Sequence, residues 1–315
     1  MIRVAAVIPA RMGSSRFPGK SLLNVRGLPM VEHVRRRTVL SGVFNDVVVA
    51  TCDRAIAETV AGYGGRVLMT AASHPGALDR VAEAMQALDC THVVNVQGDE
   101  ILVLPGDLRR VAEAVSREPA VEAWNAAAKI ERPDELRDPS IVKLLISRTG
   151  RVLFCARRYE LVPGDPSAEA ACKSVGIMAF TRAFLERFVR LPRTPLERAG
   201  GMDQLRILEH DLTLRTVWLE RGYPTINEPR EVALVETSLA TDREQHAVLE
   251  QILLDPAIGP RPWPGAPSAV LQRTGGRDVR PTRGVVEGAT GPSTGSGSLD
   301  RSRAKSRDLP VGLHP

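Results

Sequence analysis

Short apolar runs and segments of helical periodicity alternate through the first hundred residues. Three runs are rich in β-branched residues and end in polar loops: Val4–Ile8, Val47–Thr51 and His92–Val96. Runs that are apolar at successive positions are typical of strands buried on both faces of a parallel sheet. Three further segments place their apolar residues on one helical face: 30–40, 54–63 and 78–88. This alternation predicts right-handed βαβ units, and hence an α/β fold with a mostly parallel sheet and helices on both faces.

The pattern changes to shorter strands after residue 140. We expect strands at Ile141–Ile146, Val152–Cys155 and Ser174–Phe180, and a helix that begins near Ala183. Strands that crowd together in this way predict an α+β extension over about 140–225. Such an extension is suited to supply an acceptor pocket or a dimer surface.

The composition shifts beyond residue 254. Pro, Gly, Ser and Arg dominate stretches such as EGATGPSTGSGSLDRSRAKSRD at 287–308, which cannot bury enough apolar surface to offset the entropy of ordering. We therefore expect a folded domain over 1–254 and a disordered tail over 255–315. Nine basic and four acidic residues from position 256 onward account for the whole formal net charge of +5. They are scattered and almost without aromatic neighbours, which favours a solvated tail over one that binds nucleic acid.

Several classes of protein are disfavoured by the remaining composition. No apolar run approaches the roughly 20 residues of a membrane span, and the first residues lack the pattern of a signal peptide. We therefore expect a cytoplasmic protein that does not bind membranes. The four cysteines have no CxxC spacing, and the six histidines have no HxxxH or HExxH spacing. A disulfide framework and a zinc site are accordingly not expected.

The loop after the first strand, ARMGSSRFPGK at residues 10–20, concentrates positive charge. Three cations and two glycines lie within it: Arg11, Gly13, Arg16, Gly19 and Lys20. Ligands of parallel sheets bind at the carboxyl ends of the strands, and exposed N–H groups beside cations form a cradle for an anion. A GxxxxGK[ST] phosphate loop is excluded because Ser14 stands where that motif requires glycine. The loop predicts a phosphate site, with a generic basic surface loop as the alternative.

A second polar loop follows the predicted strand at 92–96, in the sequence VVNVQGDE. Gln97 and Asp99 are delivered to the same edge of the sheet as the first loop. A carboxylate facing a phosphate cradle is a natural magnesium ligand, and the amide of Gln97 can bind a base or a sugar. The alternative is a turn in which Asp99 merely caps the next segment, and the pattern alone leaves both open.

Two later segments, KSVGIMAFTR at 173–182 and TPLERAGGMDQLR at 194–206, set polar residues among apolar ones. A sugar pocket has this character. The spacing is equally well explained by a core strand followed by a helix with a solvated face.

IPARMGSSRFPGKSLLNVRGLPMVEHV at 8–34 closely resembles the opening of the cytidylyltransferases that make CMP-3-deoxy-manno-octulosonate, and VVNVQGDE resembles their second signature. The resemblance spans about residues 3–250. It implies a nucleotide-diphospho-sugar transferase-like fold, CTP and a small acidic acceptor as substrates, Mg²⁺ as cofactor and a homodimer as the assembly. The implied reaction transfers CMP to an acceptor such as a 3-deoxy-keto-sugar acid and releases pyrophosphate.

The resemblance also implies roles for individual residues. Arg11, Lys20 and Asp99 would be catalytic, and Asp99 and Asn227 would hold the metal. The nucleotide-binding residues would be Ala10, Arg11, Gly13, Ser14, Arg16, Lys20, Arg80 and Gln97. The acceptor-binding residues would be Arg157, Ser174, Met178, Glu197, Asp203 and Gln204.

The chain departs from the family pattern in four places, one of which is Ala71, where the family has an Arg. Asn227 stands where the family has its second metal-binding Asp, and residues 74–80 read HPGALDR in place of HQSGTER. In the acceptor segment, a His and two Tyr of the family are replaced by Ser174, Met178 and Phe180. These changes predict an altered acceptor pocket, and they leave two alternatives: a cytidylyltransferase for a non-sugar acid such as a phosphonate, or a weakly active nucleotide-binding paralogue.

Overall fold

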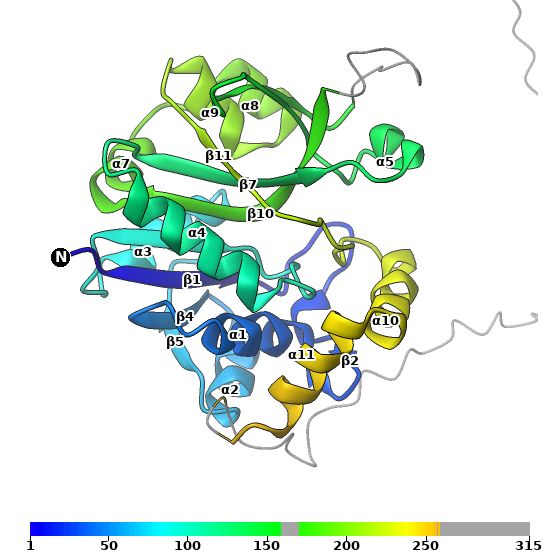
Figure 1. The fold of residues 1–315 in the computed structure, drawn as a ribbon. Helices are drawn as coiled ribbons and strands as arrows, with labels where there is room; N and C mark the ends of the chain where they lie inside the picture. Colours follow the sequence, from blue (N-terminus) through cyan, green and yellow to red (C-terminus); the bar gives the residue numbers. More distant parts are fainter. Residues whose placement is uncertain (159–169, 257, 259–315) are drawn as a thin grey trace, which may run out of the picture. The chain divides into compact units, whose positions relative to one another are not determined.

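One large sheet organises the described part of the chain, which comprises residues 1–158, 170–256 and 258 of this computed structural model (Figure 1). Its main strands follow the order β11-β7-β10-β6-β1-β4-β5. They are β1 (Val4–Ala10), β4 (Asp46–Thr51), β5 (Arg66–Met69), β6 (His92–Val96), β7 (Ala123–Lys129), β10 (Ala171–Thr181) and β11 (Arg215–Trp218). A two-stranded ribbon of β2 (Asn24–Val25) and β3 (Leu28–Pro29) lies outside it.

Strand directions confirm a mostly parallel sheet, with one antiparallel insertion. β1 pairs in parallel with β4 and β6, and β7 pairs in parallel with β11. β10 runs antiparallel between β6 and β7. The sequence placed Ser174–Phe180 in a separate extension, but this segment is a central strand of the main sheet. An apolar run reveals burial on both faces, not strand direction.

The remaining strands continue outward from β10. β8 (Lys143–Ile146) pairs with the first residues of β10, and β9 (Val152–Ala156) pairs with β8, both antiparallel. Both match strands expected from the sequence to within two residues. They form the α+β part of the fold that projects beside the parallel core.

Helices cover both faces of the sheet, as predicted. Alternate residues of β1 serve two cores: Ala5 and Val7 pack in one, Val4 and Ile8 in the other. In Figure 1, α1 and α4 cross in front of the sheet and α3 lies behind it. The helices are α1 (Met30–Leu40), α2 (Arg54–Gly62), α3 (Ala77–Met85), α4 (Pro105–Arg117), α5 (Pro133–Arg137), α7 (Arg182–Phe188), α8 (Pro195–Gly200), α9 (Asp203–Glu209), α10 (Val232–Thr241) and α11 (Arg243–Leu254), with 3₁₀ turns η1 (Lys20–Leu22) and η2 (Pro229–Glu231).

A third apolar cluster fixes the segment before η2. Ile226 is fully buried in it, together with Met30 of α1 and residues of α10 and α11. The segment around Asn227 is thereby held at the same edge of the sheet as the loop after β1. No helix in the described ranges is long and apolar enough to span a membrane. The predicted tail lies outside the described residues, apart from positions 255, 256 and 258.

Candidate active site

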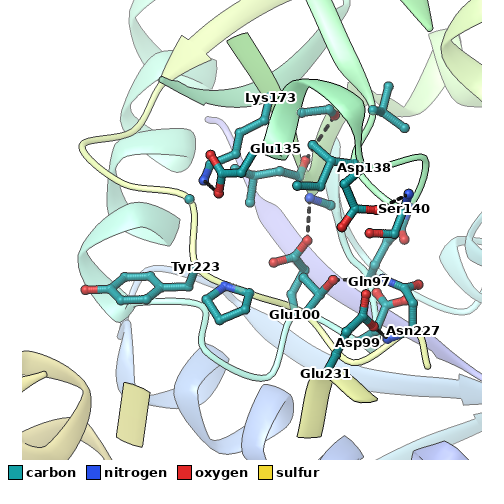
Figure 2. Close-up of a pocket in the computed structure, with 18 of the residues that line it drawn as sticks. Gln97, Asp99, Glu100, Glu135, Asp138, Ser140, Lys173, Tyr223, Asn227 and Glu231 are labelled. Carbon is teal, nitrogen blue, oxygen red and sulfur yellow. Dashed lines mark hydrogen bonds and ion pairs between the residues drawn. The ribbon is translucent and has the colours of Figure 1, made fainter. Parts of the chain in front are cut away.

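A cavity of about 660 Å³ lies where the loops after β1 and β6 meet β10. Figure 2 shows Gln97, Asp99 and Glu100 on one side of it and Lys173 and Glu135 on another, with Asn227 and Glu231 near Asp99. The first group follows β6 directly, so the carboxyl edge of the parallel strands forms part of the cavity wall, as expected for α/β sheets.

Lys20 joins three segments that are distant in the sequence. Its Nζ donates to Asp99 Oδ2 at 2.9 Å and to the carbonyl oxygen of Ile226 at 2.7 Å. Both partners in the Lys20–Asp99 ion pair are less than one-fifth exposed. The cation of the first loop and the carboxylate of the second are therefore in direct contact.

Arg16 makes the second link across this edge. Its guanidinium donates to Asn227 Oδ1 at 2.8 Å. Arg157 lines the same cavity as Arg16, and its pKa is lowered first by burial and then by the charge of Arg16. Arg157 further donates to the carbonyl oxygen of Ser140 at 3.1 Å. Two guanidinium groups thus line one region of the cavity, an arrangement suited to carboxylate or phosphate.

Glycine and hydrogen bonds shape the loop over residues 10–20. Gly19 has φ of +78°, a left-handed conformation that other residues rarely adopt. The backbone N–H groups of Ser14 and Gly19 both donate to the carbonyl oxygen of Met12 at 2.9 Å. Asp53 Oδ2 accepts from the N–H of Met12 at 2.8 Å, which anchors the loop to the end of β4.

Six of the eight predicted nucleotide residues do not line the cavity: Ala10, Arg11, Gly13, Ser14, Lys20 and Arg80. The side chain of Arg11 is exposed, and a side chain built at Gly13 would meet open space. Arg80 is buried, donating to Thr70 Oγ1 and, at 3.5 Å, to Cys52 Sγ. Its contacts place it beneath the ends of β4 and β5. Gln97, by contrast, lines the cavity itself.

Glu100 connects the loop after β6 to β10, and the sequence did not single it out. Its Oε1 accepts from the N–H of Gly176 at 2.6 Å, while the N–H of Gln97 donates to the carbonyl oxygen of Gly176 at 2.9 Å. A Cβ at Gly176 would lie 2.6 Å from Glu100 Oε1, so any other residue there would displace the Glu100 carboxylate. Burial, and next the charge of Asp99, raise the pKa of Glu100 to about 8.

This contact lies at an irregularity in β10. The pairing register of β10 with β7 shifts between Ser174 and Met178. A bulge bends a strand and redirects its side chains. Here the shift lies in the stretch of β10 that borders the cavity.

Five of the six predicted acceptor residues line the cavity: Arg157, Ser174, Met178, Asp203 and Gln204. The pKa of Asp203 is raised to about 6, first by burial. Glu197 is placed elsewhere. Its carboxylate is buried in a bidentate ion pair with Arg206, at 2.8 Å and 2.5 Å, and it does not line the cavity.

A buried ion pair that the sequence did not reveal also lines the cavity. Lys173 Nζ lies 2.8 Å from Glu135 Oε1, and both side chains are almost fully buried. Gly222 packs so closely that a Cβ there would lie 2.4 Å from Lys173 Cε. Lys173 belongs to the quoted segment KSVGIMAFTR, but nothing in that pattern indicated a partner 38 residues earlier.

Two oxygen donors in the cavity suit a magnesium ion. Among the described residues there is no group of three or more His, Cys, Asp or Glu side chains that could hold a metal. Asp99 provides a carboxylate and Asn227 an amide oxygen, and both lie in the segments that Lys20 joins. Magnesium is commonly held by one or two protein oxygens together with substrate phosphates, so this set fits an ion that also binds a triphosphate.

Comparisons with known proteins identify the family. The family described as Cytidylyltransferase matches residues 5–214. The chain is 36% identical over 245 residues to the 3-deoxy-manno-octulosonate cytidylyltransferase of Syntrophotalea carbinolica, covering 75% of this chain and 98% of that protein. It is 34% identical to the 8-amino-3,8-dideoxy-manno-octulosonate cytidylyltransferase of Shewanella piezotolerans, covering 76% of this chain and all of that protein.

A solved structure supports the same family assignment. The structure of CMP:2-keto-3-deoxy-manno-octonic acid synthetase complexed with CTP has a TM-score of 0.71 and 30% identity, and the match covers 76% of this chain and 99% of the other. The fold is therefore that of a nucleotide-diphospho-sugar transferase-like enzyme. The chain belongs to the cytidylyltransferase family, as a divergent member and a nucleotidyltransferase.

Proposed function

We propose that the protein transfers CMP from CTP to a 3-deoxy-keto-sugar acid of the manno-octulosonate type. An acceptor hydroxyl oxygen attacks the α-phosphorus of CTP and forms a new O–P bond. The bond between the α-phosphorus and the oxygen that bridges it to the β-phosphorus breaks. Pyrophosphate leaves with that oxygen, and the hydroxyl proton is released to solvent. The observation that carries the proposal is the contact of Lys20 with Asp99, because Asp99 lines the same cavity as five of the acceptor candidates. The relatives named above act on acids of this type.

The donor side of the proposed site works by positioning and by neutralising charge. Such phosphoryl chemistry needs no covalent nucleophile from the protein. Arg11 and Lys20 would bind the triphosphate, assisted by a second group: Ala10, Gly13, Ser14 and Arg16. Gln97 and Arg80 would lie near the nucleotide. A magnesium ion held by Asp99 and Asn227 would neutralise phosphate charge.

The acceptor side uses the cations and polar groups beyond the loop after β6. Arg157, next to Arg16, would bind the carboxylate of the sugar acid, because paired guanidinium groups suit a planar anion. Ser174, Asp203 and Gln204 would bind hydroxyl groups, with Met178 packing against the carbon chain. We leave Glu197 out of this set because its carboxylate is buried against Arg206.

An assay of pyrophosphate release tests the function. Purified protein with CTP, Mg²⁺ and 3-deoxy-manno-octulosonate is expected to release pyrophosphate and form the CMP-sugar, while ATP, GTP and UTP give much lower rates. The 8-amino analogue and a phosphonate are included as acceptors. The absence of turnover with either sugar acid would contradict the proposal. No relative named above favours the phosphonate or inactive alternatives.

Replacing Asn227 by Asp is expected to strengthen magnesium binding. A carboxylate binds a divalent cation more strongly than a neutral amide, and Asp99 already supplies one charge at this edge. We expect the magnesium concentration for half-maximal rate to fall about tenfold, which corresponds to about 1.4 kcal/mol. Titration of the rate with Mg²⁺ measures it, with Asn227→Ala as the matched variant expected to shift the other way. An unchanged titration curve in both variants would remove Asn227 from the metal site.

We also propose that the protein forms a homodimer through the surface of β8 and β9. The support is that β9, which pairs only with β8 among the described strands, carries two exposed large apolar side chains, Leu153 and Phe154, at 50% and 38%. A sheet edge with exposed apolar side chains favours a protein interface. Light scattering is expected to give twice the chain mass, and Leu153→Glu to give the single-chain mass.

A further inference from the structure

A fully buried asparagine lies beneath the acceptor side of the cavity. Asn125 stands on β7, in register with Met178 of β10 and Thr216 of β11, and no part of it is exposed. A buried amide is costly unless its donors and acceptors are paired. Asn125 meets this requirement through residues that the proposed function assigns to acceptor binding.

Its hydrogen bonds fix the orientation of the amide. Asn125 Nδ2 donates to the carbonyl oxygen of Ala126 at 2.7 Å and to Ser174 Oγ at 3.1 Å. A backbone carbonyl only accepts, so the NH₂ group of Asn125 must face it. Asn125 Oδ1 consequently points away from the Ala126 carbonyl and is available only as an acceptor, for Gln204 and for Ser174 Oγ at 3.4 Å.

This orientation dictates how Gln204 is turned. Gln204 Nε2 donates to Asn125 Oδ1 at 3.1 Å. The reversed amide would set two oxygens against each other, so Gln204 must keep its NH₂ group toward Asn125. Gln204 lines the cavity, and within the described residues its Oε1 has no hydrogen-bond partner and is not sealed from solvent. Oε1 is thus a fixed acceptor available to a ligand.

We propose that Asn125 is a positioning residue that selects an acceptor substrate presenting a hydroxyl or amino group to Gln204 Oε1. The inference rests on the proposed function, which it deepens. The Ala126 carbonyl fixes the amide orientation of Asn125, and Asn125 fixes that of Gln204. Gln204 Oε1 then binds a hydrogen-bond donor of the substrate and repels a carbonyl or ether oxygen. Ser174 Oγ accepts from Asn125 Nδ2, and its own proton has acceptors within the protein: Asn125 Oδ1 at 3.4 Å and the carbonyl oxygen of Val175 at 3.5 Å.

Asn125→Leu tests whether Asn125 orients Gln204, because leucine has a similar size and its side chain has no polar atoms. We expect the KM for 3-deoxy-manno-octulosonate to rise about tenfold and the KM for CTP to stay within about twofold, since Gln204 becomes free to rotate. Thr216→Val is the matched control: at the paired position on β11 it removes a buried hydroxyl that has no hydrogen-bond partner among the described residues, and it should change neither KM.

Analogues of the acceptor that each lack one hydroxyl give the sharper readout. Wild-type protein is expected to discriminate against one of them by at least tenfold in kcat/KM, and Asn125→Leu is expected to lose most of that discrimination. A mere packing role for Asn125 would lower kcat/KM for all analogues alike. Should Asn125→Leu fail to fold, Gln204→Met carries the same comparison and must lose discrimination against the same analogue.

The outcomes separate the two proposals. A wild-type protein that turns over no sugar acid overturns the proposed function, and this inference with it. If the wild-type protein is active and Asn125→Leu still discriminates between the analogues, the inference alone is overturned. If Asn125→Leu is unfolded, discrimination that survives in Gln204→Met has the same consequence. Equal increases of the KM for CTP and for the acceptor would also overturn it.

Discussion

Asparagine in place of Asp99 is expected to lower kcat by about three orders of magnitude, since one charged group that stabilises a phosphoryl transition state contributes several kcal/mol. The substitution keeps the shape of the side chain and removes its charge. The proposed magnesium ligand then loses its negative charge, and the ion pair with Lys20 at 2.9 Å is lost. Steady-state kinetics at saturating CTP and Mg²⁺ measures the effect.

The fold is expected to tolerate this change. The ion pair of Asp99 is partly exposed, and Lys20 keeps its hydrogen bond to the carbonyl oxygen of Ile226. Asp89→Asn is the matched control, because Asp89 is largely exposed and pairs with Arg3 far from the cavity. Its rate and melting temperature should equal those of the wild type. A kcat for Asp99→Asn within tenfold of the wild-type value would contradict the assignment of Asp99 to the catalytic site.

The parallel half of the sheet could be predicted because strands buried on both faces of a sheet are continuous apolar runs. β6 and α1 have the predicted bounds, and β1 and β4 differ from them by one or two residues. Each of these strands is buried on both faces and rich in Val or Ile. β7 was missed because its sequence, AWNAAAK, contains no β-branched residue. It is a strand through its place between β10 and β11, an instance of tertiary context overriding local propensity.

The first two motifs could be joined in advance because strand topology brings them together. The carboxyl ends of β1 and β6 are adjacent in the sheet, so a cation and a carboxylate in the following loops must lie near each other. The contributions of Glu100 and Asn125 could not be foreseen. Both depend on which residue of β10 faces them, and the direction and register of β10 are not encoded in its own apolar pattern.

Glu197 shows how a motif match can assign a structural residue to a binding site. Its segment contains Asp203 and Gln204, which do line the cavity, and spacing alone does not distinguish the three. In the structure the two oxygens of Glu197 are bound to Arg206, whose guanidinium also lies 4.4 Å from the centre of the Phe188 ring. The pair joins α8 to α9 and so supports the wall from which Asp203 and Gln204 reach the cavity.

Methionine in place of Arg206 is therefore expected to destabilise the fold by about 3 kcal/mol, because the buried carboxylate of Glu197 would keep only the longer contact of 3.6 Å to the partly exposed Arg193. Urea denaturation measures the free energy of unfolding. Arg187→Met is the matched control, since Arg187 also lies over a phenylalanine ring but pairs with Glu122 where both side chains are half-exposed. Its loss should be no more than about 1 kcal/mol.

The double variant Arg206→Met with Glu197→Leu distinguishes a structural from a binding role for Glu197. Replacing a buried ion pair by apolar residues of similar size is often nearly neutral, so most of the lost stability should return. A structural pair then predicts that the double variant also recovers the KM for the acceptor, because α8 and α9 are packed again. An acceptor-binding Glu197 predicts the opposite: stability returns while the KM for the acceptor stays high.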